Sequence, residues 1–166
     1  MIFILPAYVA NAAPVALRTG SSPPMDMSMR WGDRRRILGR GKTILGFLAG
    51  VAAGTGAGAI IALLVPLYPS IETQIMAAFL LSFGAMIGDA AGSFIKRRLA
   101  FTRNKPFYVV DQITFVLFAL ALVYIFGALP AFIDVVGVVL LIILTFVLHV
   151  GTNYVAYKLG LKKVPH

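Results

Sequence analysis

Two aspartates set into apolar segments are the residues of this sequence best suited to chemistry. Asp89 precedes the basic run 96–98 by two helical turns, and Asp111 is followed directly by Gln112. An ionised carboxylate in hydrocarbon is costly and is rarely kept without a partner or a function. We therefore interpret both aspartates as candidate site residues. The alternative is that each carboxylate only neutralises a basic neighbour inside the protein.

Helical spacing places further polar residues beside Asp89. At about 100° per residue, Ser93 and Lys96 share its helix face, and Arg97 lies about 80° away. Asp111 begins the next apolar segment, and antiparallel packing would return it toward the depth of Asp89. Two carboxylates below a basic rim predict a site for Mg²⁺ and a polyphosphate, because this cation takes carboxylate, phosphate and water oxygens.

The composition indicates an integral membrane protein. Of the 166 residues, 60% are hydrophobic and only 13% are charged, and the mean hydropathy is +0.91. A soluble domain does not have this balance. Cysteine is absent from the sequence, which excludes disulfides and thiolate chemistry. We predict an all-α, polytopic membrane bundle in which residues 1–166 form one catalytic domain.

Apolar stretches of about 20 residues predict five transmembrane helices. The first is the least regular, because it contains Pro6, Asn11 and Pro14. It resembles a signal peptide in part but lacks a basic start, so we expect a retained helix. The predicted spans are 2–17, 44–66, 73–94, 108–128 and 131–156.

All 15 lysines and arginines fall outside these spans and on alternate connections. They lie in the loops 18–43 and 95–107 and in the tail 157–166. The positive-inside rule makes these segments cytoplasmic, with the N-terminus outside and the C-terminus in the cytoplasm. A net charge of +9 would suggest nucleic acid in a soluble protein, but here it follows from the topology. We expect no nucleic-acid partner.

Glycines recur every fourth residue in two of the predicted spans. One set lies at 46–58 and the other at 84–92. Small residues at this spacing form a smooth stripe that lets helix backbones approach closely in lipid. We interpret the stripes as the contact of two tightly packed helices, and a homodimer contact remains the alternative.

The end of the first loop is a second candidate phosphate site. Glycines punctuate the basic segment 34–43, which ends in Lys42 and Thr43 at the start of a predicted helix. The glycine spacing is not that of a P-loop. Backbone N–H groups at a helix start, together with a lysine and a hydroxyl, nevertheless suit phosphate oxygens.

The last predicted span carries a polar stripe of Thr145, His149 and Asn153. Such residues should face the bundle interior or a water-filled cavity. They leave a second function open, a small transporter or accessory subunit with an ion or proton path through Asp89, Asp111 and His149. The concentration of ionisable residues at one membrane face argues against a continuous path.

Four motifs together resemble the archaeal CDP-archaeol synthases, which are membrane relatives of the CDP-diacylglycerol synthases. The resemblance covers nearly the whole chain. One departure is Ile44-Leu45-Gly46, where the family typically has Trp-Arg-Gly. The motifs are the run 6–14, the segment 38–43, Gly88-Asp89 with 92–98, and Asp111-Gln112.

This resemblance implies cytidylyl transfer from CTP to an ether-linked isoprenoid glycerol phosphate, with pyrophosphate as the second product. It implies a multi-pass enzyme of the cell membrane whose active site faces the cytoplasm and whose lipid substrate enters from the bilayer. Mg²⁺ is the expected cofactor, held by Asp89 and Asp111. The other implied roles are Lys96 and Arg97 on the triphosphate, Lys42 and Thr43 on phosphate, and Asn11, Ser93 and Gln112 as orienting groups.

Overall fold

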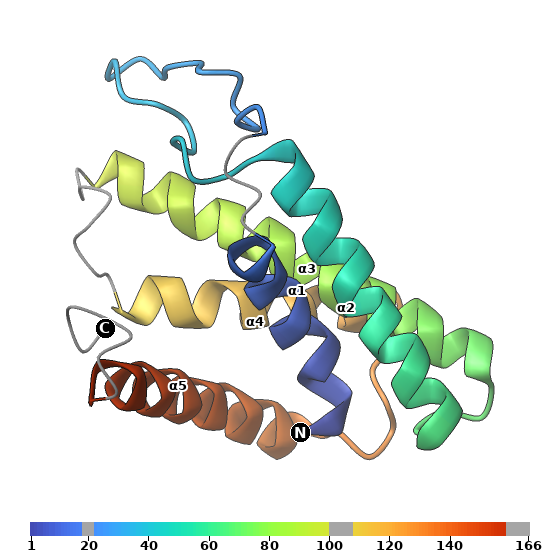
Figure 1. Cartoon of the computed structure of the whole chain (residues 1–166). Coiled ribbons are helices and arrows are strands. Elements are labelled where there is room, and N and C mark those ends of the chain that lie inside the picture. The colour runs from blue at the N-terminus through green and yellow to red at the C-terminus, as the bar shows by residue number, and fades with distance from the viewer. Residues whose placement is uncertain (18–21, 100–107, 159–166) are drawn as a thin grey trace.

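The computed structural model describes residues 1–17, 22–99 and 108–158, without the side chains of 108–112, 149 and 152–157. The described residues form helices and connecting turns, with no strand among them, so the predicted all-α class is confirmed for this part of the chain. Figure 1 shows their arrangement. The elements are the 3₁₀ turn η1 (Ile2–Ile4) and the helices α1 (Leu5–Ala16), α2 (Ile44–Leu64), α3 (Ile71–Arg98), α4 (Tyr108–Ile125) and α5 (Val135–Lys158).

The helix bounds follow the predicted spans to within a few residues, with corrections at α3 and α5. Helix α5 begins at Val135 rather than at residue 131 and continues through Lys158, so residues 157–158, which were predicted as tail, are helical. Helix α3 continues through Arg98, so residues 95–98, which were predicted as loop, are helical. Its 28 residues reach about 42 Å at 1.5 Å per residue, which exceeds the hydrocarbon thickness of about 30 Å. By length and composition α2 and α3 are able to cross a membrane, whereas the other described apolar stretches, 2–16, 113–125 and 135–148, are shorter.

The basic residues of the described part gather at one end of the bundle. Figure 1 shows the loop 22–43 at the same end as the C-terminal ends of α3 and α5. The N-terminus and the turns 65–70 and 126–134 lie at the other end. The predicted segregation of charge is therefore present in the folded chain.

The glycine stripe of α2 fits against two other helices. All four of its glycines are buried. A Cβ added at Gly54 would lie 2.4 Å from Ser82 Oγ of α3 and 2.5 Å from the Pro6 carbonyl oxygen of α1. At Gly58 it would lie 2.1 Å from the Ala78 Cβ. The stripe thus seats α2 on α1 and α3 together.

The glycines of α3 pack against a different helix, α4. A Cβ at Gly84 would lie 2.7 Å from the Ala119 Cα, and one at Gly88 would lie 2.4 Å from the Thr114 carbonyl oxygen, both on α4. Close packing at the stripes is confirmed, but the two stripes do not face each other as a pair. The glycines with these close contacts pack against helices of the same chain.

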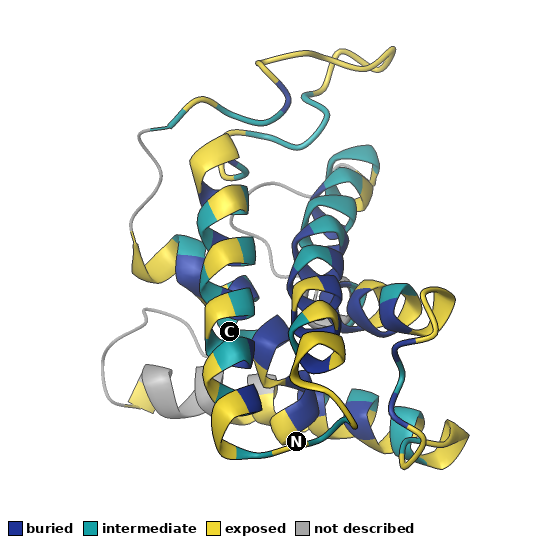
Figure 2. Cartoon of the chain, turned by 90° about the vertical axis from the view of Figure 1, so that its right-hand side faces the viewer, coloured by how far each residue is buried: buried dark blue, intermediate teal, exposed yellow. Residues whose placement is uncertain are grey.

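Buried apolar side chains from four helices make the core, which includes Ile4, Leu81, Phe115 and Val123. A hydrogen bond of 2.6 Å between the Tyr8 hydroxyl and Thr145 Oγ1 joins α1 to α5. Outside this core, large apolar residues on the outer faces of α2 and α5 are exposed (Figure 2). In a membrane bundle these faces contact acyl chains.

The turns at the N-terminal end are tied together by two polar side chains. The Gln74 amide accepts a hydrogen bond from the Leu67 N–H and donates one to the Val65 carbonyl, each at 2.9 Å. The Tyr68 hydroxyl donates to the Ala128 carbonyl, and burial raises the pKa of Tyr68, so the phenol stays protonated. The Gln74 bonds fix the α2–α3 turn to the start of α3, and the Tyr68 bond joins that turn to the α4–α5 turn.

The close approach at Gly54 predicts a large cost for one added methyl group. Gly54→Ala should lower the free energy of unfolding by about 1–3 kcal/mol, because backbone and Ser82 must move apart. Thermal unfolding in detergent, followed by circular dichroism, measures the effect. Gly56→Ala is the control, since nothing lies within 4 Å of its added Cβ. Equal melting temperatures for the two variants would contradict the packing described.

Candidate active site

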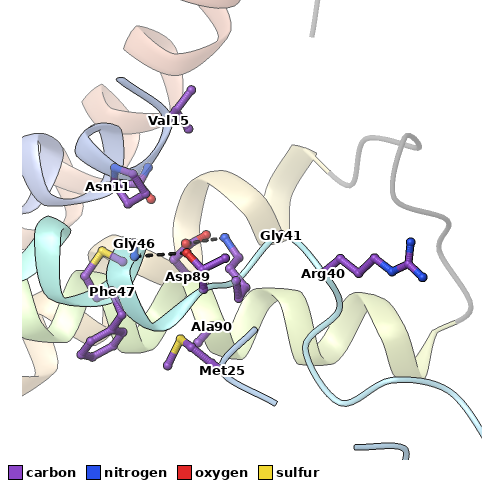
Figure 3. Close-up of a pocket in the computed structure, with 13 residues that line it drawn as sticks. Asn11, Val15, Met25, Arg40, Gly41, Gly46, Phe47, Asp89 and Ala90 are labelled. Carbon is purple, nitrogen blue, oxygen red and sulfur yellow. Dashed lines mark hydrogen bonds and ion pairs between the residues drawn. The ribbon is translucent and has the colours of Figure 1, made fainter. Parts of the chain in front are cut away.

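A cavity of about 700 Å³ lies at the basic end of the bundle, between α1, α2, α3 and the loop 22–43 (Figure 3). Its wall combines polar and apolar side chains. The polar residues are Asn11, Arg40, Lys42, Thr43 and Asp89. The apolar residues include Pro14, Val15, Met25, Phe47 and Met86. A site that combines charged and apolar side chains can accommodate an amphiphile.

The central contact of the cavity is an ion pair between Lys42 Nζ and Asp89 Oδ2. Lys42 ends the loop and Asp89 lies on α3, so residues far apart in the sequence meet here. Each side chain keeps about a quarter of its exposure. The structure therefore brings the predicted carboxylate and the predicted phosphate-binding lysine into one site.

Thr43 has a structural role at this site. Its Oγ1 accepts a hydrogen bond of 3.1 Å from the Gly46 N–H, which caps the N-terminus of α2. The residue is buried and lines the cavity. Its N-cap position explains how the chain turns from the loop into α2 directly beside Lys42.

The loop is held in shape by Asp26, which sequence reasoning missed. Its carboxylate accepts hydrogen bonds from the backbone N–H groups of Ser28, Leu38 and Gly39, at 3.0, 3.1 and 2.9 Å. Burial acts to raise the pKa of Asp26, but these three donors and the Arg36 guanidinium outweigh it and lower the pKa. The negative charge of Asp26 thus organises the two arms of the loop.

Arg98 fastens this loop to the end of α3. Its guanidinium donates to Asp33 Oδ1 at 2.6 Å and to the Arg36 carbonyl at 2.8 Å. Desolvation acts to raise the pKa of Asp33, but the Arg35 N–H and the Arg98 charge lower it overall. Arg98 follows Asp89 by nine residues, which at about 100° per residue places it on the opposite side of α3.

Aromatic packing adds to this attachment. The Trp31 ring meets Phe94 edge-on, with centroids 5.8 Å apart. The Arg98 guanidinium carbon lies 5.3 Å from the Phe94 ring centroid and 6.0 Å from that of Trp31. Both distances allow a cation–π interaction. The loop is therefore docked on α3 by charge and by apolar contact together.

Three predicted site residues of α3 lie outside the cavity wall. Ser93 is buried, and Lys96 is partly buried in the last turns of the helix. Arg97 lies under the loop at Gly39, where an added Cβ would be 3.5 Å from its Nε. Asp89, Ser93 and Lys96 share a helix face as predicted, but only Asp89 of these reaches the cavity, because the last turns lie under the loop.

Asp111 and Gln112 belong to α4, but their side chains lie outside the described residues, as do those of His149 and Asn153. The backbone still gives the register. Gly88 packs against Thr114 and Phe115, so position 111 is about one helical turn nearer the basic end of the bundle. Among the side chains that the structure describes, no group of three or more His, Cys, Asp or Glu residues gathers as a metal cluster.

Arg40 is a cavity residue that the sequence analysis left among the general basic residues of the loop. It lines the cavity, and Figure 3 shows its side chain extending away from Asp89. The sequence did contain a signal for this residue, because Arg40 stands between Gly39 and Gly41, two residues before Lys42.

Comparison of the fold places the chain in a class of enzymes. A solved structure described as an intramembrane enzyme for archaeal membrane lipids biosynthesis superposes with a TM-score of 0.81 and 39% sequence identity. The match covers 92% of this chain and 90% of that chain. The helical bundle with a polar cavity at one end is therefore the fold of an intramembrane lipid enzyme.

The sequence comparisons give the particular family. Residues 1–166 match the family described as CarS-like, CDP-archaeol synthase. Curated CDP-archaeol synthases from Thermococcus gammatolerans, Pyrococcus horikoshii and Methanocaldococcus jannaschii are 48%, 46% and 40% identical, each over 98% of this chain and 92–93% of their own length. The chain belongs to the CDP-archaeol synthase family. The resemblance identified from its motifs is confirmed, and the transporter alternative is not favoured.

The lowered pKa values of Asp26 and Asp33 predict how the loop responds to acid. A carboxylate with a lowered folded-state pKa contributes stability above its unfolded-state pKa of about 4, and this is lost as pH falls through the folded-state value. The fluorescence of Trp31, which reports on this loop, should stay constant from neutral pH to about 5 and change below about 4.

Asp26→Asn should loosen the loop already at neutral pH, because the variant removes the charge that holds its two arms. Hydrogen exchange at the Leu38 and Gly39 amides measures this, and faster exchange is expected. Asp134→Asn is the matched control, since the Asp134 carboxylate accepts one backbone N–H at the opposite end of the bundle. Unchanged exchange in Asp26→Asn would refute the assignment.

Proposed function

We propose that this chain transfers the cytidylyl group of CTP to the phosphate of an ether-linked isoprenoid glycerolipid, forming CDP-archaeol and pyrophosphate. The reaction takes place in the cell membrane, with the cavity open to the cytoplasm and residues 1–166 acting as one catalytic domain. The observation that carries this proposal is the Lys42–Asp89 pair in a cavity lined by both polar and apolar side chains.

The transfer needs positioning and charge neutralisation more than acid–base chemistry. An oxygen of the ionised lipid phosphate forms a bond to the α-phosphorus of CTP, while the bond from that phosphorus to the β-bridging oxygen breaks. The electron pair leaves with pyrophosphate. Because the nucleophile is already an anion, no general base is required, and the protein must align two anions that repel each other.

Lys42 is suited to this task because two anionic partners compete for it. In the structure its ammonium group neutralises Asp89. When the triphosphate enters the cavity, Lys42 contacts phosphate oxygens at the start of α2, where backbone N–H groups also point outward. Lys42 then offsets charge that builds up on the departing pyrophosphate.

The residues present fit Mg²⁺ as the cofactor. Asp89 presents a carboxylate to the cavity, and Asn11, on α1, faces the same space. Mg²⁺ is commonly bound by one or two carboxylates with substrate phosphates and waters. Asp89 and Asp111 would hold the ion, which supplies charge neutralisation for the triphosphate when bound. Asn11 and Gln112 would orient the ligands around it.

Lys96 and Arg97 would guide the triphosphate at the cytoplasmic mouth, with Ser93 supporting the helix face between them and Asp89. At the end of α1, Val15 lines the cavity and is 81% exposed, so it offers an apolar surface to a lipid chain. The isoprenoid chains would stay in the membrane while the lipid phosphate enters laterally. This arrangement matches an amphiphilic substrate and a water-soluble nucleotide that approach from different directions.

Asp89→Asn and Asp111→Asn should each lower the rate of CDP-lipid formation by at least about 100-fold, because each removes charge from the proposed cation site. The assay follows lipid-dependent pyrophosphate release from CTP by purified protein, with and without Mg²⁺. Glu72→Gln, an acidic residue in the first turn of α3 at the far end, is the control and should retain activity. The proposed site would be refuted if Asp89→Asn kept full activity. It would also be refuted if the wild-type protein kept its full rate in excess chelator.

Lys42→Met should lower kcat by about 10²–10³, because the variant keeps much of the side-chain length but loses the ammonium group. Without the competing ammonium group, Mn²⁺ should also bind Asp89 more tightly in the absence of nucleotide, as measured by electron paramagnetic resonance. Arg40→Met is the matched control, since Arg40 lines the cavity but extends away from Asp89 (Figure 3). Equal Mn²⁺ affinity in wild type and Lys42→Met would contradict the proposal that Lys42 exchanges Asp89 for the triphosphate.

A further inference from the structure

The segment 27–31 of the loop exposes large apolar side chains. Met27, Met29 and Trp31 are 71%, 56% and 57% exposed, although they lie outside the membrane-spanning helices. Three large apolar side chains within five residues of one loop are therefore exposed. Exposed apolar clusters of this kind mark contact with a membrane or a partner.

The polar residues that alternate with them are engaged inside the loop. Asp26 binds three backbone N–H groups. Ser28 Oγ accepts a hydrogen bond of 2.8 Å from Arg36, and Arg30 donates one of 3.2 Å to the Arg34 carbonyl. The hydrogen-bonding groups of these residues are thus used within the loop, whereas the three apolar side chains are left exposed, which is costly in water.

The position of Trp31 on α3 matches the depth of a membrane interface. About 20 helical residues cross the hydrocarbon, so a span that begins near Gln74, the first buried residue of α3, ends near Phe94. Trp31 packs on Phe94, and the neighbouring Ile95 is also exposed. Tryptophan is enriched at this level because its ring is apolar and its N–H is polar.

The charge of the loop selects the kind of membrane surface. Residues 22–43 contain six basic and two acidic residues, which leaves a net charge of +4. Both acidic groups are occupied, Asp26 by backbone N–H groups and Asp33 by Arg98. Arg30, Arg34 and Arg35 are exposed near the apolar side chains. Such basic clusters are attracted to anionic headgroups.

We propose that residues 27–31 form a membrane anchor that inserts into the interface of an anionic leaflet. The apolar side chains contact the upper acyl region, and the surrounding arginines bind lipid phosphates. Because the same loop ends in Lys42, the anchor holds the catalytic lysine relative to the leaflet from which a lipid substrate arrives. The anchor itself requires no enzymatic activity and stands apart from the proposed function.

Trp31 gives a direct test, because it is the only tryptophan in the chain. The full-length protein is reconstituted in vesicles of phosphatidylcholine alone or rich in phosphatidylglycerol, and quenching by aqueous acrylamide is compared with quenching by brominated acyl chains. We expect about threefold lower acrylamide quenching and stronger bromolipid quenching in the anionic vesicles. The difference between vesicles should shrink in 1 M salt, as screening requires.

A double variant, Met27→Ser with Met29→Ser, should restore acrylamide access while keeping Trp31 as the reporter. Met76→Ser is the matched control, because Met76 is a similarly exposed methionine, 57%, on α3. Equal acrylamide access in detergent and in both vesicles would overturn the anchor and favour a protein partner for this surface. Equal protection of Trp31 from acrylamide in both kinds of vesicle would show that the anchor does not require anionic lipid, and would overturn this part of the proposal. Neither readout depends on turnover.

Discussion

The charge of Asp89 is the constraint on which the site depends. A carboxylate on a helix that crosses the membrane needs a cation at short range, since the surrounding medium screens it poorly. Lys42 supplies that cation from a loop rather than from a neighbouring helix. The loop must therefore keep a fixed shape and position, which Asp26 and Arg98 provide. Residues far from the cavity become necessary because one partly buried charge must be balanced.

Much of this arrangement could be predicted from the sequence because its signals are periodic or compositional. Apolar runs located the helices, the isolated charge pointed to Asp89, and the position of Lys42 at a helix start marked a phosphate site. Asp26 carries no such signal. It acts through hydrogen bonds to backbone N–H groups 12 and 13 residues away, and any residue can supply such groups. Contacts of this kind become visible only after the loop has folded.

The glycine stripes show a second limit of sequence reasoning. A stripe specifies that a neighbour comes close, but it does not specify which helix that neighbour is. Gly54 contacts both α1 and α3, whereas Gly88 faces α4. The order of helices around α3 is decided by the whole set of contacts. Similarly, helical spacing correctly grouped Asp89 with Lys96 on one helix face, but only Asp89 lines the cavity.

Helix α1 ends at Ala16, and its last turn, with Pro14 and Val15, forms part of the cavity wall, opposite in polarity to the start of α2. A helix carries about half a negative charge at its C-terminus and half a positive charge at its N-terminus. The cavity thus lies in a fixed electric field between two helix ends. This field has a direction before any ligand enters, so it favours the anionic groups of a ligand at the α2 end of the cavity.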